Sequence, residues 1–576
     1  MFRARAGPIT RLLPWRSGTA VPQIPKATVS RKVSGMFRFA ATSALALGIA
    51  APALADVTPA QVWENLQENY ADFGYQVTGQ VEDGGGTLTV RDAVFSMKNE
   101  GGATTFTIPR LTFQETGDAR VRMVIEGDMA LDSTFLVPAP PEDAPADAPA
   151  DDPADNPADN PADGTQAAPA APEMVEMTTT GTLKVPGNET VVSGTPEDML
   201  YEFSYPTMAF DLTMPADPET GATVPVTGTL TDVTGTQRQG AAAEGSETSF
   251  DAKASEATVQ IAADAPAEAE DAGNGKLNLQ VRLTDLTSTG TAKMPAQSFD
   301  LGSQMAQALA AGLDFQGDFG FGAMDIGFDF AGRNDAGEDE TGSGTVALGA
   351  GNASLRMSAD GLGYKGDVAE TRAEMTASSL PFPVSYAADR TRFDLLIPVS
   401  KADAAQPFKF AYALEGLTFA DAIWDLFDPG RQLPRDPASL TVDLSGDAVV
   451  AENLLDPAIG QPGGPTPPDA PFTPRTLTVN TVALDAVGAK AEITGALEFG
   501  DNPNEPVGKL NGTFEGVNGL MDKLVAMNLV PEEQMMGMRM MLAMFAKPDE
   551  ANPDRLTSEI EFREGGRIFA NGQQVK

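Results

Sequence analysis

Short runs in which apolar and polar residues alternate recur from residue 87 to the end of the chain, and they constrain its fold more than any other feature. Examples occur at 87–90, 105–108, 121–125, 181–185, 275–281, 344–348, 440–444 and 475–479. A period of two places successive side chains on opposite faces of a strand, and glycine-rich turns between such runs are typical of antiparallel sheets. No fixed repeat length relates the runs, so a solenoid or a propeller is not expected. The sequence therefore predicts large curved antiparallel sheets around an apolar interior.

One helix is expected before these strands. Thr58 has the position of an N-cap, Pro59 suits the first helical position, and Gln61 would complete a capping box. Four apolar residues then share one helix face: Val62, Trp63, Leu66 and Tyr70. The spacing predicts a helix of about three turns that packs on an apolar surface.

The C-terminal residues 509–576 predict a strand–helix–helix–hairpin module. A strand is expected at 509–516, helices at 517–527 and 531–545, and a hairpin that joins 560–563 to 567–570. The expected fold class is α+β and dominated by β-structure, with large curved antiparallel sheets, an N-terminal helix and a C-terminal helix pair.

A leader segment is expected at residues 36–55. Met36 and Arg38 begin a short basic region, an apolar run follows from Ala40 to Ala50, and Ala53-Leu54-Ala55 forms a small-x-small cleavage site. This pattern indicates a secretory signal peptide rather than a buried N-terminal helix, with cleavage before Asp56. Residues 1–35 are basic and contain no acidic residue, which favours a mis-assigned upstream extension over an organellar transit peptide. Residues 56–576 are then expected to form a single β-rich domain.

Residues 138–172 form a Pro-Ala-Asp array that offers almost no apolar area to bury. Such a composition stays extended and solvated, so the array is predicted to be disordered. Strand-like sequence lies on both sides of it, which favours a long loop within one sheet over a linker between domains.

The chain contains no histidine and no cysteine. Their absence excludes disulfides, Ser-His-Asp triads, cysteine nucleophiles, His/Cys zinc sites and cysteine-held iron–sulfur clusters. Carboxylate chemistry would remain, but no pair of acidic residues stands out among 81 of them. We therefore expect a protein that is not an enzyme and has no cofactor; a carboxylate-based hydrolase is the weaker alternative.

The charge of the chain limits its partners. Residues 1–55 hold eight basic and no acidic residues, which leaves 31 basic and 81 acidic residues, a net charge of −50, in the expected mature chain. A field of this sign repels nucleic acid, so no nucleic-acid partner is expected. No transmembrane segment is expected in the mature chain either.

Methionine is concentrated near the C-terminus, at positions 521, 527, 535, 536, 538, 540, 541 and 544. Met538, Met541, Leu542 and Phe545 share one face of the predicted helix and form a possible apolar groove. Three interpretations are open: packing against the sheet, an adaptable lining for a lipid or a partner, and a thioether site for Cu(I).

Two other segments contain residue types that are common in binding sites. Residues 334–340 gather acidic side chains in a turn that could hold Ca²⁺, but they lack the EF-hand order, which favours a solvated hairpin tip. The glycines at 317–327 do not form a phosphate-binding motif, and their alternation with aromatic residues suits a curved strand.

Several segments resemble a bacterial family known as domain of unknown function 2125. They lie at 57–63, 74–75, 88–92, 199–201 and 433–434. The resemblance covers most of the expected mature chain and implies an exported periplasmic protein of a Gram-negative alphaproteobacterium. The closing residues 567–572 are also similar to the ends of large periplasmic β-rich proteins, some of them linked to envelope lipid handling. The resemblance implies no catalytic residue.

The expected function follows from these points. We expect a non-enzymatic periplasmic protein that binds a lipid or another apolar ligand, or that takes part in envelope maintenance. The alternative is a structural or interaction module whose partner is another envelope protein.

Overall fold

The computed structural model describes residues 57–72, 74–99, 102–138, 174–215, 223–242, 245–264, 275–299, 301, 304–333, 337–456, 471–500, 502–552 and 554–576. The predictions of an upstream extension at 1–35 and a signal peptide at 36–55 concern residues outside this range. The predicted disordered array also lies outside it, except for Pro138.

The described residues form one antiparallel sheet of 26 strands with five short helices beside it. The helices are α1 (Pro59–Asp72), α2 (Met305–Ala310), α3 (Asp421–Trp424), α4 (Val517–Ala526) and α5 (Glu532–Phe545). The first strands are β1 (Gln76–Asp83), β2 (Thr87–Asn99), β3 (Gly102–Glu115), β4 (Val121–Glu126), β5 (Met129–Pro138), β6 (Met174–Lys184), β7 (Glu189–Thr195), β8 (Asp198–Pro215), β9 (Thr223–Ala242), β10 (Gly245–Asp264), β11 (Lys276–Pro295), β12 (Asp314–Phe321) and β13 (Ala323–Arg333). The others are β14 (Asp339–Leu348), β15 (Gly351–Ser358), β16 (Gly361–Ala377), β17 (Val384–Ile397), β18 (Ala402–Phe419), β19 (Ala438–Val450), β20 (Phe472–Ala486), β21 (Ala489–Glu498), β22 (Val507–Glu515), β23 (Lys547–Pro548), β24 (Arg555–Arg563), β25 (Arg567–Ala570) and β26 (Gln573–Gln574).

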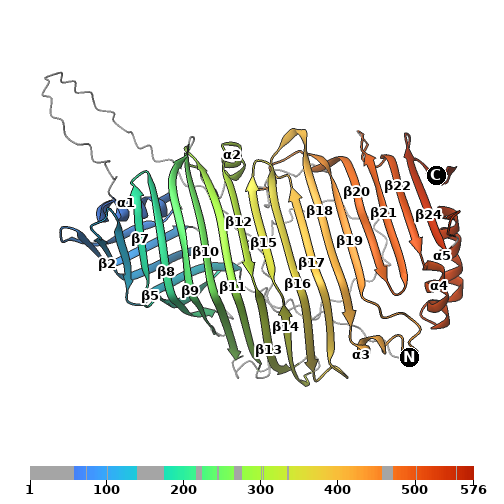
Figure 1. Ribbon diagram of the computed structural model, residues 1–576, viewed down its shortest axis with the longest axis horizontal. Helices are drawn as coiled ribbons and strands as arrows, with labels where there is room; N and C mark the ends of the chain where they lie inside the picture. The colour runs from blue at the N-terminus through green and yellow to red at the C-terminus, as the bar shows by residue number, and fades with distance from the viewer. Residues whose placement is uncertain are drawn as a thin grey trace, which may run out of the picture.

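The strands lie side by side in nearly their order along the chain, from α1 at one end of the molecule to α4 and α5 at the other (Figure 1). At several positions two shorter strands lie end to end beside one long strand. In this way β4 and β5 pair with β3, β6 and β7 with β8, β12 and β13 with β11, and β14 and β15 with β16. At about 4.8 Å a strand, the sheet is roughly 90 Å long.

The first core cluster lies under α1. The predicted capping box is present: the Thr58 N–H donates to Gln61 Oε1 (2.9 Å), and the Gln61 N–H donates to Thr58 Oγ1 (3.4 Å). Val62 and Trp63 are buried against β2, β3, β4, β7 and β8, with the Trp63 ring 6.1 Å from that of Phe113. The Tyr201 hydroxyl donates to Asn65 Oδ1 (2.7 Å), and burial raises the pKa of this tyrosine. These contacts fix α1 to one end of the sheet.

A second, smaller cluster lies under α2. Leu309 and Leu313 are buried together with Val399, and Leu362 and Ile397 pack around them. These last two residues lie at neighbouring ends of β16 and β17, so α2 covers one margin of the sheet.

The loop after α3 is held by a buried carboxylate. Asp428 is 1% exposed and accepts hydrogen bonds from the N–H groups of Gln432 (2.8 Å) and Leu433 (2.9 Å). Burial alone would raise its pKa, but these two N–H groups and the charge of Arg435 outweigh it and lower the pKa.

The expected fold class is confirmed, with one difference. The predicted β-domination is present, but the several sheets expected from the sequence are one continuous sheet. Each hairpin shares a strand with the next, so no edge separates one sheet from another. The strands on either side of the Pro-Ala-Asp array, β5 and β6, pair directly with each other up to Pro138 and Met174.

Candidate functional site: the apolar face of the sheet

One face of the sheet is apolar along most of its length. Residues directly opposite each other on neighbouring strands share a face, so the strand registers identify rows of side chains that cross the sheet. The first row is Met129, Leu183, Phe210, Gly228, Val259, Val281, Ile326, Val346, Ala373, Tyr386 and Phe419. Apart from its one glycine, every member has an apolar or aromatic side chain.

A second row crosses the same face and continues to the C-terminal end. It consists of Phe250, Gly290, Gly317, Leu355, Tyr364, Leu395, Phe410, Leu444, Val479, Gly495, Leu510, Ile560 and Ala570. At about 4.8 Å a strand, this row is roughly 60 Å long.

Glycines in these strands are repeatedly paired with phenylalanine. In eight such pairs the ring of the phenylalanine lies over the glycine directly opposite: Phe203–Gly235, Phe210–Gly228, Phe250–Gly290, Phe321–Gly351, Phe328–Gly344, Phe330–Gly342, Phe393–Gly366 and Phe408–Gly446. A Cβ at Gly228, for example, would lie 2.3 Å from Phe210 Cζ. The missing side chain lets each ring lie across the neighbouring strand, which covers the glycine backbone with an apolar surface.

A fold line crosses the long strands near their middle. On β9, Leu230 and Val233 both belong to the apolar face, and Thr231 and Asp232 lie between them. Regular alternation would allow only one residue there. Asp232 has a positive φ of 52°, which accommodates the extra residue.

The same irregularity continues across the sheet. Asp92, Asp285 and Glu370 also have positive φ within β2, β11 and β16, at 49°, 51° and 51°. Ser255 Oγ donates to Asp232 Oδ2 (3.1 Å), which joins β10 to β9 at this line. The Gly322 N–H donates to the Thr284 carbonyl (2.8 Å), so the junction of β12 and β13 lies on the line as well.

The positions of the extra residues indicate a concave apolar face. Two residues on the polar side lengthen that side, so each strand bends toward its apolar side. Beside the line, Ala254 and Ala388 on the apolar face are 7% and 4% exposed, whereas Asp232 and Asp285 on the polar side are exposed. We call the concave apolar face the trough.

The walls of the trough carry large side chains that are open to solvent. Seven aromatic residues on the apolar face are between 37% and 47% exposed: Phe315, Phe319, Tyr364, Tyr386, Phe393, Phe410 and Phe419. Monomeric soluble proteins rarely leave such large continuous apolar patches uncovered, and where they occur they mark binding surfaces.

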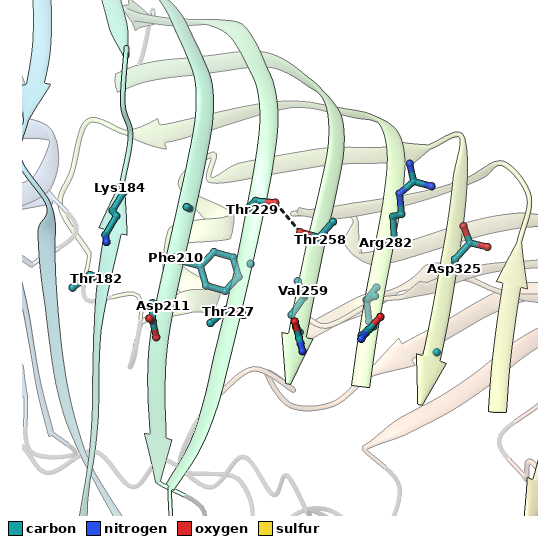
Figure 2. A pocket seen from close by; sticks show the side chains of 16 residues that line it. Thr182, Lys184, Phe210, Asp211, Thr227, Thr229, Thr258, Val259, Arg282 and Asp325 are labelled. Atoms are coloured by element: carbon teal, nitrogen blue, oxygen red, sulfur yellow. Dashed lines mark hydrogen bonds between the residues drawn. The ribbon is translucent and has the colours of Figure 1, made fainter. Parts of the chain in front are cut away.

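The outer, polar face has a shallow depression of about 680 Å³ over β6 to β13. Its lining includes Lys184, Asp211, Arg282 and Asp325, and Thr229 and Thr258 share a hydrogen bond of 2.7 Å. Figure 2 shows these side chains spread along successive strands rather than converging on a common point. The arrangement resembles a solvated sheet surface more than a catalytic site, for which convergent polar groups are needed.

The predicted groove residues lie on α5, at the C-terminal end of the sheet. Met538, Met541 and Phe545 are 46%, 57% and 37% exposed, and Leu542 is half-buried. Within α5, Met535 is the buried residue. The structure therefore brings the four residues together on one helix and leaves them largely uncovered.

No metal site is found within the described residues, which contain no group of three or more histidine, cysteine, aspartate or glutamate side chains able to hold an ion. The acidic turn considered for Ca²⁺ connects β13 to β14, and its residues 334–336 lie outside the described range.

The sequence did not predict which residues form the trough. Its members are brought together by register between strands that are far apart in the chain, which a local pattern does not reveal. A signal for the fold line was present: in β9 the apolar positions change from even numbers, up to Leu230, to odd numbers from Val233.

Comparison with known proteins gives a match to a bacterial family over part of the chain. Residues 325–570 match the model of a family described as an uncharacterized protein conserved in bacteria, DUF2125. None of the curated proteins compared with the chain matches it. Of the solved structures, the alcaligin outer membrane receptor FauA from Bordetella pertussis aligns with 86% of this chain and 68% of its own, at 10% identity and a TM-score of 0.15. A score this low does not indicate a shared fold.

The match supports the expected family assignment over residues 325–570, in the C-terminal part of the chain. Of the five segments that suggested the family, only 433–434 lies within the matched range. No helix among the described residues is long and apolar enough to cross a bilayer.

Proposed function

Residues 325–570 match the DUF2125 family, whose description assigns no activity. We therefore propose a function from the trough itself: the protein binds the acyl chains of a lipid. The observation that carries the proposal is the pair of apolar rows that continue from strand to strand on one solvent-exposed face. An acyl chain gains about 0.8 kcal/mol for each methylene group removed from water.

The shape of the trough favours a long flexible ligand. Phenylalanine rings that lie over glycines give a low apolar surface. The rows cross many strands, so they set no fixed ligand length. Acyl chains match such a surface because they need only apolar contact and no directional partner.

The proposal includes a non-enzymatic role and a periplasmic location. The chain lacks histidine and cysteine, and its polar depression gathers no convergent groups, so binding explains the architecture without catalysis. The signal-peptide pattern at 36–55 supports export. The N-terminal residue of the protein recovered from the periplasm should be Asp56; retention of residues 1–35 would contradict export by this signal.

The proposal is tested by the lipid content of the purified protein. Lipids extracted under denaturing conditions are identified by mass spectrometry, and affinity is measured with a fluorescent fatty acid. The double variant Phe393→Gln/Phe410→Gln should bind at least tenfold more weakly, since each ring contributes about 1 kcal/mol of apolar contact.

The matched control is Thr345→Gln, which changes an exposed side chain on the polar face opposite Glu374. It should bind like the wild type. Equal affinity of all three proteins, or a wild-type protein that neither carries nor binds lipid, would refute the proposal. Recovery of a protein partner on the trough would instead favour the interaction module.

A further inference from the structure

We propose that the helix pair α4–α5 docks on a lipid bilayer and is the end at which lipid enters the trough. The occupant that we propose for this surface is a lipid bilayer. The docking part of the proposal does not depend on the proposed function, whereas the entry part rests on it.

The first observation is the apolar surface of α5. Large side chains on α5 and on the turn before it are 45% to 66% exposed: Leu529, Met536, Met538, Met540, Met541 and Met544. They surround most of the helix, whereas a helix at the surface of a soluble protein normally has one apolar stripe. A helix that is apolar nearly all round needs an apolar medium.

The length of α5 determines how it would meet that medium. Its 14 residues extend about 21 Å, which is less than the bilayer core of about 30 Å. The helix would therefore lie in the interfacial region instead of spanning the membrane. Methionine suits this position because its flexible thioether side chain adapts to disordered chains.

The charge distribution supplies a second, independent observation. Residues 509–576 contain eight basic and ten acidic residues, a net charge of −2, whereas residues 56–508 contain 23 and 71, a net charge of −48. The strongly negative part of the chain is repelled by anionic lipid, so the nearly neutral C-terminal part is the one that can approach a bilayer.

The third observation is continuity with the trough. The second apolar row ends at Leu510, Ile560 and Ala570, on strands β22, β24 and β25. The last turn of α5 is fixed to these strands, since Ser558 Oγ (2.6 Å) and Asn571 Nδ2 (3.0 Å) donate to the Phe545 carbonyl. At the opposite end of the sheet, α1 forms a closed core. The two ends therefore differ: α5, with its exposed apolar side chains, lies beside the last strands of the row. Figure 1 shows α5 and α1 at opposite ends of the sheet.

The docking is tested by flotation of the purified protein with vesicles of phosphatidylcholine and phosphatidylethanolamine. The test variant is the triple Met536→Gln/Met540→Gln/Met544→Gln, on one exposed helix face; its control carries leucine at the same positions. The wild type and the leucine variant should float, and the glutamine variant should partition at least tenfold more weakly with an unchanged melting temperature. Equal flotation of the glutamine variant, or a wild type that does not float, overturns the docking.

Entry is measured separately, as the rate at which a fluorescent phospholipid leaves the vesicles for the protein. The glutamine variant should accept lipid at least tenfold more slowly, whereas its affinity for a soluble fluorescent fatty acid should be unchanged. Weak flotation with a wild-type transfer rate would place entry elsewhere and overturn this part. A protein that floats but never binds lipid would refute the proposed function and leave the docking in place.

Discussion

At the scale of single residues, the glycines of the sheet fall into two kinds that the sequence does not distinguish. Gly228 lies under the ring of Phe210, and an added Cβ would also lie 2.5 Å from the Thr258 carbonyl oxygen. Gly327 lies on the polar face of the same part of the sheet, and an added Cβ would meet no atom within 4 Å. The first glycine is required by its neighbours, and the second is not.

Gly228→Ala should therefore lower the free energy of unfolding by about 1–3 kcal/mol, because the ring and the backbone must both shift. Gly327→Ala should be neutral or stabilise by about 0.5 kcal/mol, since alanine restricts the unfolded chain more than glycine does. Urea unfolding of both variants and the wild type makes the comparison. Equal stability of the two variants would show that the ring does not lie over Gly228.

Asp428 gives a prediction in the acid range. Its pKa is lowered in the folded protein, so its contribution to stability is present above the pKa of an unfolded aspartate, about 3.9, and is lost as the pH falls through the lower folded value. Asp428→Asn should be less stable than the wild type at pH 7, and the difference should shrink below about pH 4. Thermal unfolding followed from pH 7 to pH 3 measures it. A difference that does not change with pH would contradict the charged state assigned to Asp428.

At the scale of elements, strands and helices differ in what holds them. The helix α1 is capped and buried through Val62 and Trp63, whereas α5 buries chiefly Met535. The long strands are held by pairing on both sides and by the rings on their apolar face. The strands β5 and β6, on either side of the Pro-Ala-Asp array, pair with each other directly up to Pro138 and Met174.

Deletion of residues 143–168 should accordingly leave stability unchanged or raise it by about 1 kcal/mol, since a shorter loop closes at a lower entropic cost. Thermal and urea unfolding of the deletion variant measure the change. A loss of more than about 2 kcal/mol would show that the array packs on the sheet.

Many of the helices and strands could be predicted from the sequence, because each depends on the local spacing of its apolar residues. The alternating runs predicted strands, the capping box at Thr58 and Gln61 predicted α1, and the spacing of Met538 and Met541 predicted their common face on α5. The register between strands could not be predicted, since many alternating runs fit one another equally well. The positive φ of Asp232 and Asp285 has no local signature, and so the fold line and the concavity of the trough became visible only in three dimensions.

At the scale of the whole molecule, the net negative charge opposes folding, and the ion pairs on the surface offset only part of this repulsion. The expected mature chain has a net charge of −50, and the polar face carries partly exposed pairs such as Arg390–Asp367 (2.8 Å). Exposed pairs contribute about 0–1 kcal/mol each, whereas the excess of negative charge repels itself across the whole surface.

Salt should therefore stabilise the protein. Raising NaCl from 10 mM to 0.5 M shortens the screening length to below about 10 Å and should raise the melting temperature by roughly 2–4 °C. Calorimetry or circular dichroism at a series of salt concentrations measures the shift. A melting temperature that falls with salt would show that the ion pairs outweigh the repulsion.

The near-identity of chain order and spatial order gives this sheet an unusual evolutionary freedom. A hairpin inserted at almost any turn would find its partners already beside it and would lengthen the molecule by about 10 Å. Gene duplication or loss of short segments could thus adjust the reach of the protein in small steps, without redesign of a core. Inherited insertions and deletions of hairpins would therefore set the length of such a molecule, and with it the distance that the molecule can cover.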